Sequence, residues 1–212
     1  DNLSTGDMAN IVYLAPHRFY KLSFANKGFL NEVIKSGKID TVFHLAALPR
    51  VKYSIDFPSK TTKANALDTT SLYEACYGNV KRVVFASSSS VYGDTDIFPT
   101  PIHTPKRPKS PYALQKSFCE DIGAMFCENY NMDIVNLRFF NVFGPRQKPN
   151  GAYSTVISAW CDAIKNNKPL RLDGDGEQTR DMAYIDNVVD ACVLAAESKE
   201  RFSGDCFNVG SG

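Results

Sequence analysis

Tyr112 and Lys116, four residues apart in the segment SPYALQK, are the residues of this sequence best suited to acid–base chemistry. On a helix this spacing places both side chains on one face, one above the other. A phenol with a reference pKa of about 10 is a poor base at neutral pH, but an ammonium group one turn away favours the phenolate. The spacing therefore indicates a candidate general base, although a surface tyrosine and lysine on an amphipathic helix would show the same pattern.

Serines follow the apolar segment 83–86, where a buried strand is predicted. The sequence there reads VVFASSSSVYG, so hydroxyls occupy the strand end and the turn after it. A serine presented from this strand end could hydrogen-bond the substrate oxygen from which the tyrosine takes a proton.

Composition argues against several kinds of partner. The 212 residues, 43% of them hydrophobic, suffice for one sizeable core, or for one domain and part of another. A formal net charge of +1 argues against nucleic acid and against a charged membrane surface. No apolar run approaches the roughly 18 to 20 residues needed to span a bilayer, so we expect no membrane partner.

The histidines and cysteines show no metal-site spacing. The three histidines are far apart, and the six cysteines are scattered without a C-x-x-C pattern. Most of the cysteines fall in apolar surroundings, which is typical of reduced core thiols in a cytosolic protein. We therefore assign no metal and expect a cytoplasmic location.

Strand-like and helix-like segments alternate along the chain. Strands are predicted at 18–22, 40–47, 83–86, 134–139 and 207–209, and helices at 27–37, 58–77, 110–131, 153–166 and 186–198. Leu67 and Leu72 are candidate core positions of the second helix, and Asp186 is a candidate N-cap of the last. This alternation implies parallel β-α-β units, and hence an α/β fold with a doubly wound, Rossmann-like parallel sheet.

Small or polar residues stand where three of these strands end. They are Ala46 and Ala47, then Ser88, then Phe140 and Asn141. Ligands of such sheets bind at the carboxyl ends of the strands, so the pattern indicates a cofactor crevice.

Seven motifs carry a resemblance to a known family. They are DNLSTG (1–6), FHLAA (43–47), SSSSVYGD (87–94), SPYALQK (110–116), LRFFNVFGPRQ (137–147), GDGEQTRD (174–181) and FNVGSG (207–212). In this order they resemble the NAD-dependent epimerase/dehydratase family of extended short-chain dehydrogenase/reductases. Within it the sequence is most similar to the UDP-glucose and UDP-N-acetylglucosamine 4-epimerases.

The resemblance implies NAD as the cofactor. Asp1 matches an acidic residue that holds the adenosine ribose, where a carboxylate suits NAD and repels the extra phosphate of NADP. Ser88 matches the catalytic serine, Tyr112 the catalytic base, and Lys116 the lysine that also binds the nicotinamide ribose. The other implied cofactor contacts are Asn2, Ser4, Gly6, Leu45, Ala46, Ala47, Asn65 and Phe140. A usual adenine contact corresponds to Ser23-Phe24 here and departs from the family pattern.

The resemblance also implies a UDP-sugar substrate. Arg180 matches the arginine that grips the UDP diphosphate, which a planar guanidinium can pair bidentately. A surface ion pair with Asp181 is the structural alternative for that arginine. The other implied substrate contacts are Ser89, Ser90, Asn141, Tyr153 and Val156.

The implied reaction is epimerisation at C4 through a 4-keto intermediate, with Tyr112 as the base. Related 4,6-dehydratases and decarboxylases oxidise C4 in the same way but carry an acid and a base just before the V-Y-G motif. The corresponding residues here are Ser89 and Ser90, which favours the epimerase. The resemblance leaves open whether the hexose is N-acetylated, since the discriminating residue usually lies beyond position 212.

Relative to the family pattern the chain is expected to be an internal fragment, without the first strand, its G-x-x-G-x-x-G turn, and the last part of the substrate lobe. The expected domains are an NAD-binding Rossmann-like domain at 1–145 and part of the nucleotide-sugar-binding lobe at 146–212, interleaved with returning Rossmann elements. An inactive fragment or a nucleotide-sugar-binding pseudo-enzyme is the alternative from another class. The resemblance also implies a homodimer through the helices near 58–77 and 110–131.

Overall fold

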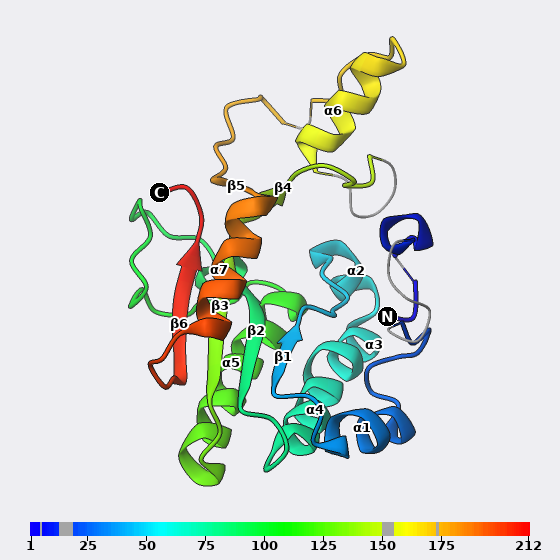
Figure 1. The fold of residues 1–212 in the computed structure, drawn as a ribbon. Helices are drawn as coiled ribbons and strands as arrows, with labels where there is room; N and C mark the ends of the chain where they lie inside the picture. The colour runs from blue at the N-terminus through cyan, green and yellow to red at the C-terminus, as the bar shows by residue number, and fades with distance from the viewer. Residues whose placement is uncertain (5, 13–18, 150–154, 173) are drawn as a thin grey trace.

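The fold was analysed in a computed structural model, which describes residues 1–4, 6–12, 19–149, 155–172 and 174–212. Within these ranges, four parallel strands form a sheet in the order β1-β2-β3-β6 (Figure 1). Their bounds are β1 Thr41–His44, β2 Arg82–Ser88, β3 Ile134–Phe139 and β6 Ser203–Val209. The α/β fold with a Rossmann-like parallel sheet is thereby confirmed.

Helices cover both faces of the sheet. On one face lie α1 (Lys27–Val33), α4 (Asp68–Cys76) and α5 (Pro111–Tyr130), and on the other lies α7 (Ile185–Glu197). Val83 of β2 packs in the hydrophobic cluster beneath α1, α4 and α5, whereas its neighbour Val84 packs in the cluster beneath α7. Because successive strand residues point to opposite faces, this alternation builds two cores on one sheet.

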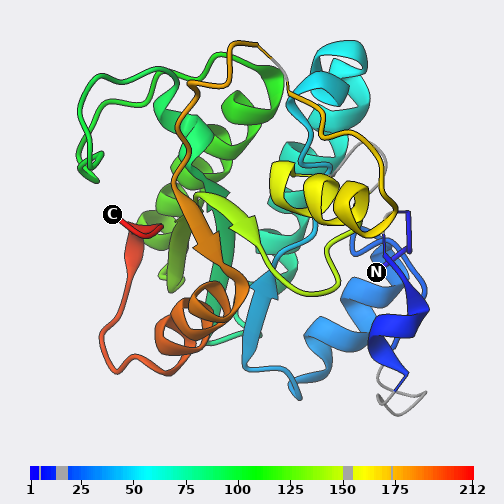
Figure 2. The same cartoon turned by 90° about the horizontal axis from the view of Figure 1, so that it is seen from above.

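A smaller unit lies beyond the carboxyl ends of the strands. Strands β4 (Asn141–Phe143) and β5 (Met182–Tyr184) pair in parallel, and α6 (Val156–Lys165) lies near them. Figure 2 looks down on this end of the molecule. After β5 the chain returns to the main sheet through α7 and β6. The domain division at residue 145 stays a prediction.

The predicted helix at 58–77 contains an irregularity. The structure has α3 (Pro58–Thr62), a π-helical segment (Lys63–Leu67) and then α4. A π turn inserts one extra residue and shifts the phase of the helix face. The prediction that Leu67 lies in the core is therefore wrong, since Leu67 is 58% exposed while Ala66 is buried. The core position of Leu72 is confirmed.

Two further predictions about local structure are wrong. Residues 19–22 form no strand, and Arg18 lies outside the described residues. Asp186 is not an N-cap, because α7 begins at Ile185 with Tyr184 as its N-cap. Asp186 lies instead in the first turn, where its negative charge interacts favourably with the positive end of the helix dipole. Short α2 (Val51–Asp56), β4 and β5 were not predicted.

Within the described ranges, no helix has the length and apolar character that crossing a membrane would require.

Candidate active site

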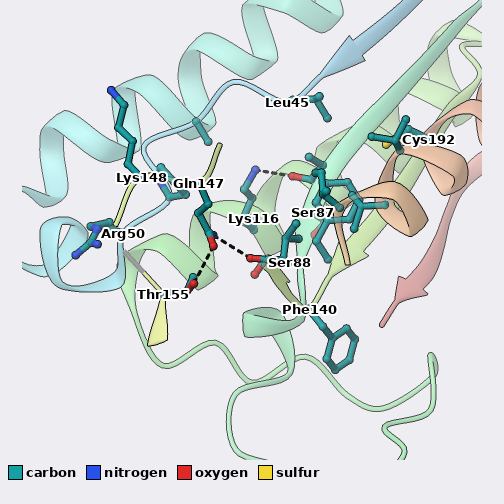
Figure 3. Close-up of a pocket in the computed structure, with 18 of the residues that line it drawn as sticks. Leu45, Arg50, Ser87, Ser88, Lys116, Phe140, Gln147, Lys148, Thr155 and Cys192 are labelled. Atoms are coloured by element: carbon teal, nitrogen blue, oxygen red, sulfur yellow. Dashed lines mark hydrogen bonds between the residues drawn. The ribbon is translucent and has the colours of Figure 1, made fainter. Parts of the chain in front are cut away.

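A pocket of about 1080 Å³ opens where β1, β2 and β3 end (Figure 3). Its walls come from segments that are far apart in the sequence: the strand ends, the start of α5, the loop after β4, and α7. The described residues that line it include Gly6, Leu45, Ala47, Ala86, Ser87, Ser88, Tyr112, Lys116, Phe140, Gln147, Lys148, Thr155 and Cys192. A cavity therefore lies at the edge of the sheet where a cofactor crevice was predicted, and its role in binding a cofactor stays a prediction.

Ser88 is the last residue of β2 and is oriented by the turn that follows. Its Oγ accepts hydrogen bonds from the Ser90 backbone N–H at 3.2 Å and from the Ser90 hydroxyl at 2.9 Å. A serine hydroxyl has two acceptor sites and one proton. Both acceptor sites are engaged by Ser90, so the Ser88 proton remains for a third group. Tyr112 on the same pocket wall is the candidate, because an interaction with Ser88 lowers the pKa of the tyrosine.

Tyr112 lies in the first turn of α5 and is held there from two sides. Ser110 caps the helix by accepting the Ala113 N–H at 3.1 Å, and Pro111 occupies the first helical position. The Tyr112 N–H, which has no partner within the helix, donates to the fully buried Ser54 of α2 at 3.0 Å. Helix α2 therefore fixes the position of the catalytic candidate.

The pKa of Tyr112 is raised above 10, because burial disfavours the phenolate more than the interaction with Ser88 favours it. Lys116 does not offset this burial. Its ammonium nitrogen lies 5.9 Å from the centre of the Tyr112 ring and donates instead to the Ala86 carbonyl at 2.5 Å. The expected lowering of the tyrosine pKa by the lysine is therefore not seen in this structure.

Lys116 is itself strongly perturbed. Burial lowers its pKa to about 8, and the charge of Glu120 on the same helix opposes this shift. An ammonium has three N–H donors, and the Ala86 carbonyl takes one of them. Lys116 lines the pocket with two donors beyond this bond, and its match to a ribose-binding lysine stays a prediction.

Some of the other predicted cofactor residues line the pocket and some do not. Gly6, Leu45, Ala47 and Phe140 line it, whereas Ala46 faces away from it. Asn65 is buried behind it, where its side chain bonds both the N–H and the carbonyl of Leu48. Asp1, Asn2 and Ser4 form an exposed turn just before Gly6, in which Asp1 and Asn2 accept backbone N–H groups. Their cofactor roles stay predictions.

The predicted substrate residues that the structure describes lie outside the pocket lining. Ser89 and Ser90 belong to the turn after Ser88, and Val156 is the exposed first residue of α6. Asn141 joins β4 to β5 by donating to the Asp181 carbonyl. Tyr153 lies outside the described residues.

Arg180 is exposed and donates to the Thr179 carbonyl, so the structure does not place it at the pocket. The ion pair with Asp181 is not formed either. The Asp181 carboxylate instead accepts backbone N–H groups of Ser211 and Gly212.

Four cationic side chains in the pocket lining were missed: Arg50, Lys52, Arg146 and Lys148. Lys148 donates to the Gly6 carbonyl at 3.3 Å, joining the loop after β4 to the N-terminal segment. Gln147 bonds the Val142 carbonyl and the Thr155 hydroxyl (Figure 3). These residues come from distant segments, so no sequence spacing unites them. The GPRQ motif was the one available signal.

The NAD dependent epimerase/dehydratase family model matches residues 2–210. The UDP-glucose 4-epimerase of Mycolicibacterium smegmatis is 37% identical over 86% of this chain and 58% of its own length. Weaker relatives include a dTDP-D-glucose 4,6-dehydratase of Dictyostelium discoideum, 29% identical over 92% of this chain and 46% of that protein.

Solved structures agree with this assignment. The UDP-N-acetylglucosamine 4-epimerase of Methanobrevibacter ruminantium superposes with a TM-score of 0.91 at 39% identity, covering 99% of this chain and 67% of that one. The UDP-glucose 4-epimerase of Thermotoga maritima gives 0.92 at 32% identity, covering 100% and 67%. This chain thus spans 58% to 67% of these three epimerases. From the family match and these relatives, we conclude that the chain belongs to the NAD dependent epimerase/dehydratase family.

Proposed function

We propose that this chain carries the catalytic residues of an NAD-dependent 4-epimerase of UDP-hexoses. The observation that carries the proposal is that Ser88, Tyr112 and Lys116 line one pocket, with Lys116 one helical turn after Tyr112 on α5. A base, a hydroxyl that stabilises it and a cation thus line one cavity. Removal and return of a proton at a sugar hydroxyl needs these groups.

The pocket fits a dinucleotide in place and chemistry. It lies at the carboxyl ends of parallel strands, and small residues such as Ala47 and Ala86 line it where a cofactor must approach the backbone. Lys116 would hold the ribose hydroxyls beside the nicotinamide. The four other cationic side chains that line the pocket suit an anionic ligand. Bound there, NAD supplies a reversible hydride acceptor.

The chain's own residues supply the proton chemistry. Tyr112 takes the proton of the C4 hydroxyl, and Ser88 donates its hydrogen bond to the oxygen on which negative charge develops. In the structure Lys116 does not lower the pKa of Tyr112, and the proposal requires its ammonium to stabilise the phenolate once ligands displace water from the pocket. In the return step Tyr112, now a phenol, gives the proton back to the C4 oxygen, and the sugar then has the opposite configuration at C4.

Elimination, as in a dehydratase, needs a second acid or base. The positions that carry it in related enzymes are Ser89 and Ser90. Among the described lining residues, Asp7 is the only carboxylate, and its side chain accepts the Ala9 N–H. The site therefore favours epimerisation over dehydration or decarboxylation.

The substrate is proposed as UDP-glucose and UDP-galactose, or their N-acetyl forms. Arg180 remains the proposed diphosphate contact. Since Arg180 lies on an exposed loop, the proposal requires this loop to meet the ligand, and Arg180→Ala should weaken UDP binding while leaving NAD binding unchanged.

The chain should be incubated with NAD and UDP-galactose, and the products followed by NMR. UDP-glucose should form without accumulation of NADH, and Tyr112→Phe should lower the rate by about a hundredfold or more. A 4-keto-6-deoxy product would instead support the dehydratase. Calorimetric titration with NAD tests the remaining alternative, because absence of binding would mark this chain as an inactive fragment.

A homodimer through the helices near 58–77 and 110–131 is also proposed. Leu67, Leu114 and Phe118 on these helices are 58%, 59% and 42% exposed. Apolar side chains gathered on two helices favour association. Leu114→Asp should therefore convert a dimer to a monomer in sedimentation velocity. Leu194→Asp, at an equally apolar exposed site on α7, is the matched control.

A further inference from the structure

A buried carboxylate lies beside the candidate site and is not used by the chemistry above. Glu120 is on α5, one turn beyond Lys116, and is only 3% exposed. Its Oε1 accepts the hydroxyl of Ser87 at 2.5 Å and the Nε–H of Arg138 at 2.9 Å, and its Oε2 accepts from Arg138 Nη2 at 2.8 Å. Lys106 lies 3.5 Å from Oε2.

We propose that Glu120 is a positioning residue that holds Ser88 against Tyr112, by joining the end of β2 to the catalytic helix through Ser87. This role rests on the proposed function, in which Ser88 and Tyr112 act on one substrate oxygen. Glu120 itself does not touch the substrate.

The geometry at the end of β2 supports this role. Ser87 and Ser88 are adjacent residues at the end of β2, so a bond that fixes Ser87 also restricts the backbone that presents Ser88. The side chain of Ser87 is anchored on α5 by Glu120, and Ser88 lines the same pocket as Tyr112 of that helix. The Ser87–Glu120 bond thereby fixes the distance of the strand end from α5.

Arg138, which is bonded to Glu120, also bonds groups around the turn after Ser88. Its Nη1 donates to the Tyr92 hydroxyl at 2.8 Å and to the Ile102 carbonyl at 3.0 Å. Tyr92 in turn donates to Asn208 of β6 at 2.6 Å. The turn that carries Ser90, which orients Ser88, is thereby held by groups from β3 and β6.

The charge of Glu120 also acts on Lys116. Although burial raises the pKa of Glu120, the hydrogen bonds from Arg138 and Ser87 lower it by more, so the group is ionised at neutral pH. Its negative charge opposes the burial that lowers the pKa of Lys116 to about 8. The other groups facing Lys116 are Cys119 on α5, Tyr112 on α5, and His44 on β1, which burial keeps neutral.

The chain contains a matched control for this carboxylate. Asp133, just before β3, is bonded by Arg82 through Nε at 3.1 Å and Nη2 at 2.7 Å, with both side chains largely buried. This pair has the same chemistry but lies at the amino end of the strands, away from the pocket lining.

The test compares Glu120→Gln, Ser87→Ala and Asp133→Asn with the unchanged chain. The first readout is the ¹³Cζ resonance of Tyr112, assigned with Tyr112→Phe, which reports its interaction with Ser88. The second is the titration midpoint of Lys116, followed by its ¹³Cε resonance. The third is the split between kcat and KM for the UDP-sugar.

The Tyr112 resonance should move in Glu120→Gln and in Ser87→Ala but not in Asp133→Asn. Glu120→Gln should also lower the Lys116 midpoint by about one pH unit, because a nearby negative charge is removed. Where turnover is observed, kcat should fall by about tenfold to a hundredfold in both variants, with KM little changed.

If neither the Tyr112 resonance nor the Lys116 midpoint moves more than in Asp133→Asn, Glu120 serves only the fold and the proposal is overturned. Ser87→Ala decides the matter should Glu120→Gln fail to fold, since it removes a single hydroxyl. The two resonance readouts need no turnover. An inactive wild-type chain whose resonances shift as expected would contradict the proposed function and still support the positioning role.

Discussion

The two ends of the parallel sheet each hold a buried arginine–carboxylate pair. At the amino end, Arg82 pairs with Asp133, and its remaining N–H groups donate to the carbonyls of Ala195, Ala196, Ser198 and Glu200. At the carboxyl end, Arg138 pairs with Glu120, and this pair bonds side chains around the pocket, including Ser87 and Tyr92. The Arg82 pair bonds the carbonyls at the end of α7, and the Arg138 pair lies beside the candidate site.

The comparison shows how similar interactions serve different ends. The carbonyls in the last turn of α7 and just after it have no partner within the helix, and Arg82 satisfies them. The carboxyl end instead buries Lys116 at a cost, since its pKa falls to about 8. The amino end therefore holds a charged pair with its hydrogen bonds satisfied, and the carboxyl end holds a buried charge that costs stability.

Arg82→Met should have the largest effect and sharpen this contrast. It leaves the Asp133 carboxylate buried and the carbonyls after α7 unpaired, so the free energy of unfolding should fall by about 3 to 5 kcal/mol. Urea denaturation measures this loss, and NAD affinity under native conditions should be unchanged. Arg201→Met, which alters an exposed arginine at the same end, should be nearly neutral. A similar loss in both variants would contradict the role given to Arg82.

Lys116→Met should change stability in the opposite direction. The lysine titrates at about 8 in the folded chain and at 10.5 as the reference value, so between these pH values the unfolded chain binds more protons. The free energy of unfolding contributed by this group therefore rises with pH from about 8 to about 10.5. At pH 7 the substitution should add up to about 3 kcal/mol, less the cost of the lost Ala86 bond.

The measurement for Lys116→Met is denaturation at a series of pH values. The difference between the variant and the unchanged chain should shrink above pH 8. A difference that is constant with pH would mean that Lys116 is not held at an unfavourable charge, and the contrast between the two ends would be lost.

Two glycines at opposite ends of the sheet give a third, smaller test. A Cβ at Gly93 (φ +66°) would overlap the Arg107 carbonyl oxygen, and one at Gly204 (φ +87°) would lie 2.7 Å from the Ala124 Cα. Each alanine substitution should cost about 1 to 3 kcal/mol in thermal unfolding. Only Gly93→Ala, which follows the Ser88 turn, should also lower turnover. Equal turnover in the two variants would break the comparison.

Exposed ion pairs should give the smallest effect, at both ends alike. Lys81 and Asp40 pair at 3.5 Å near the amino end, and Lys109 pairs with Asp94 near the carboxyl end. All four side chains are mostly exposed, so Lys81→Ala and Lys109→Ala should each change stability by less than about 1 kcal/mol. A larger change for Lys109→Ala alone, measured by denaturation in low salt, would show that the Lys109–Asp94 pair supports the structure around the carboxyl-end site.

Local patterns in the sequence predicted most of the main sheet and its helices. Strands at 83–86 and 134–139, and the helix at 110–131, follow from apolar runs whose length and flanking residues suit one structure. The error at Leu67 has a physical cause, because a π turn adds one residue and rotates the face that follows it. Short β4 and β5 were missed, since each has only three residues and pairs with a distant segment.

The candidate site divides in the same way. Tyr112 and Lys116 share one helix, so their spacing alone determined that they lie together, and the motif order in the chain determined the family. Contacts across the fold were decided only by the tertiary structure. Ser54 supports Tyr112 from 58 residues away, and Glu120 reaches Ser87 across 33 residues.

The reason is that a helix repeats over a few residues, whereas a pocket is formed wherever the strands and helices meet. Sequence periodicity reports the first of these directly. Burial, which raises the pKa of Tyr112 and lowers that of Lys116, depends on every segment packed around them. The sequence by itself therefore determined which residues are the candidates for the chemistry, and the tertiary structure decided how they are charged and held.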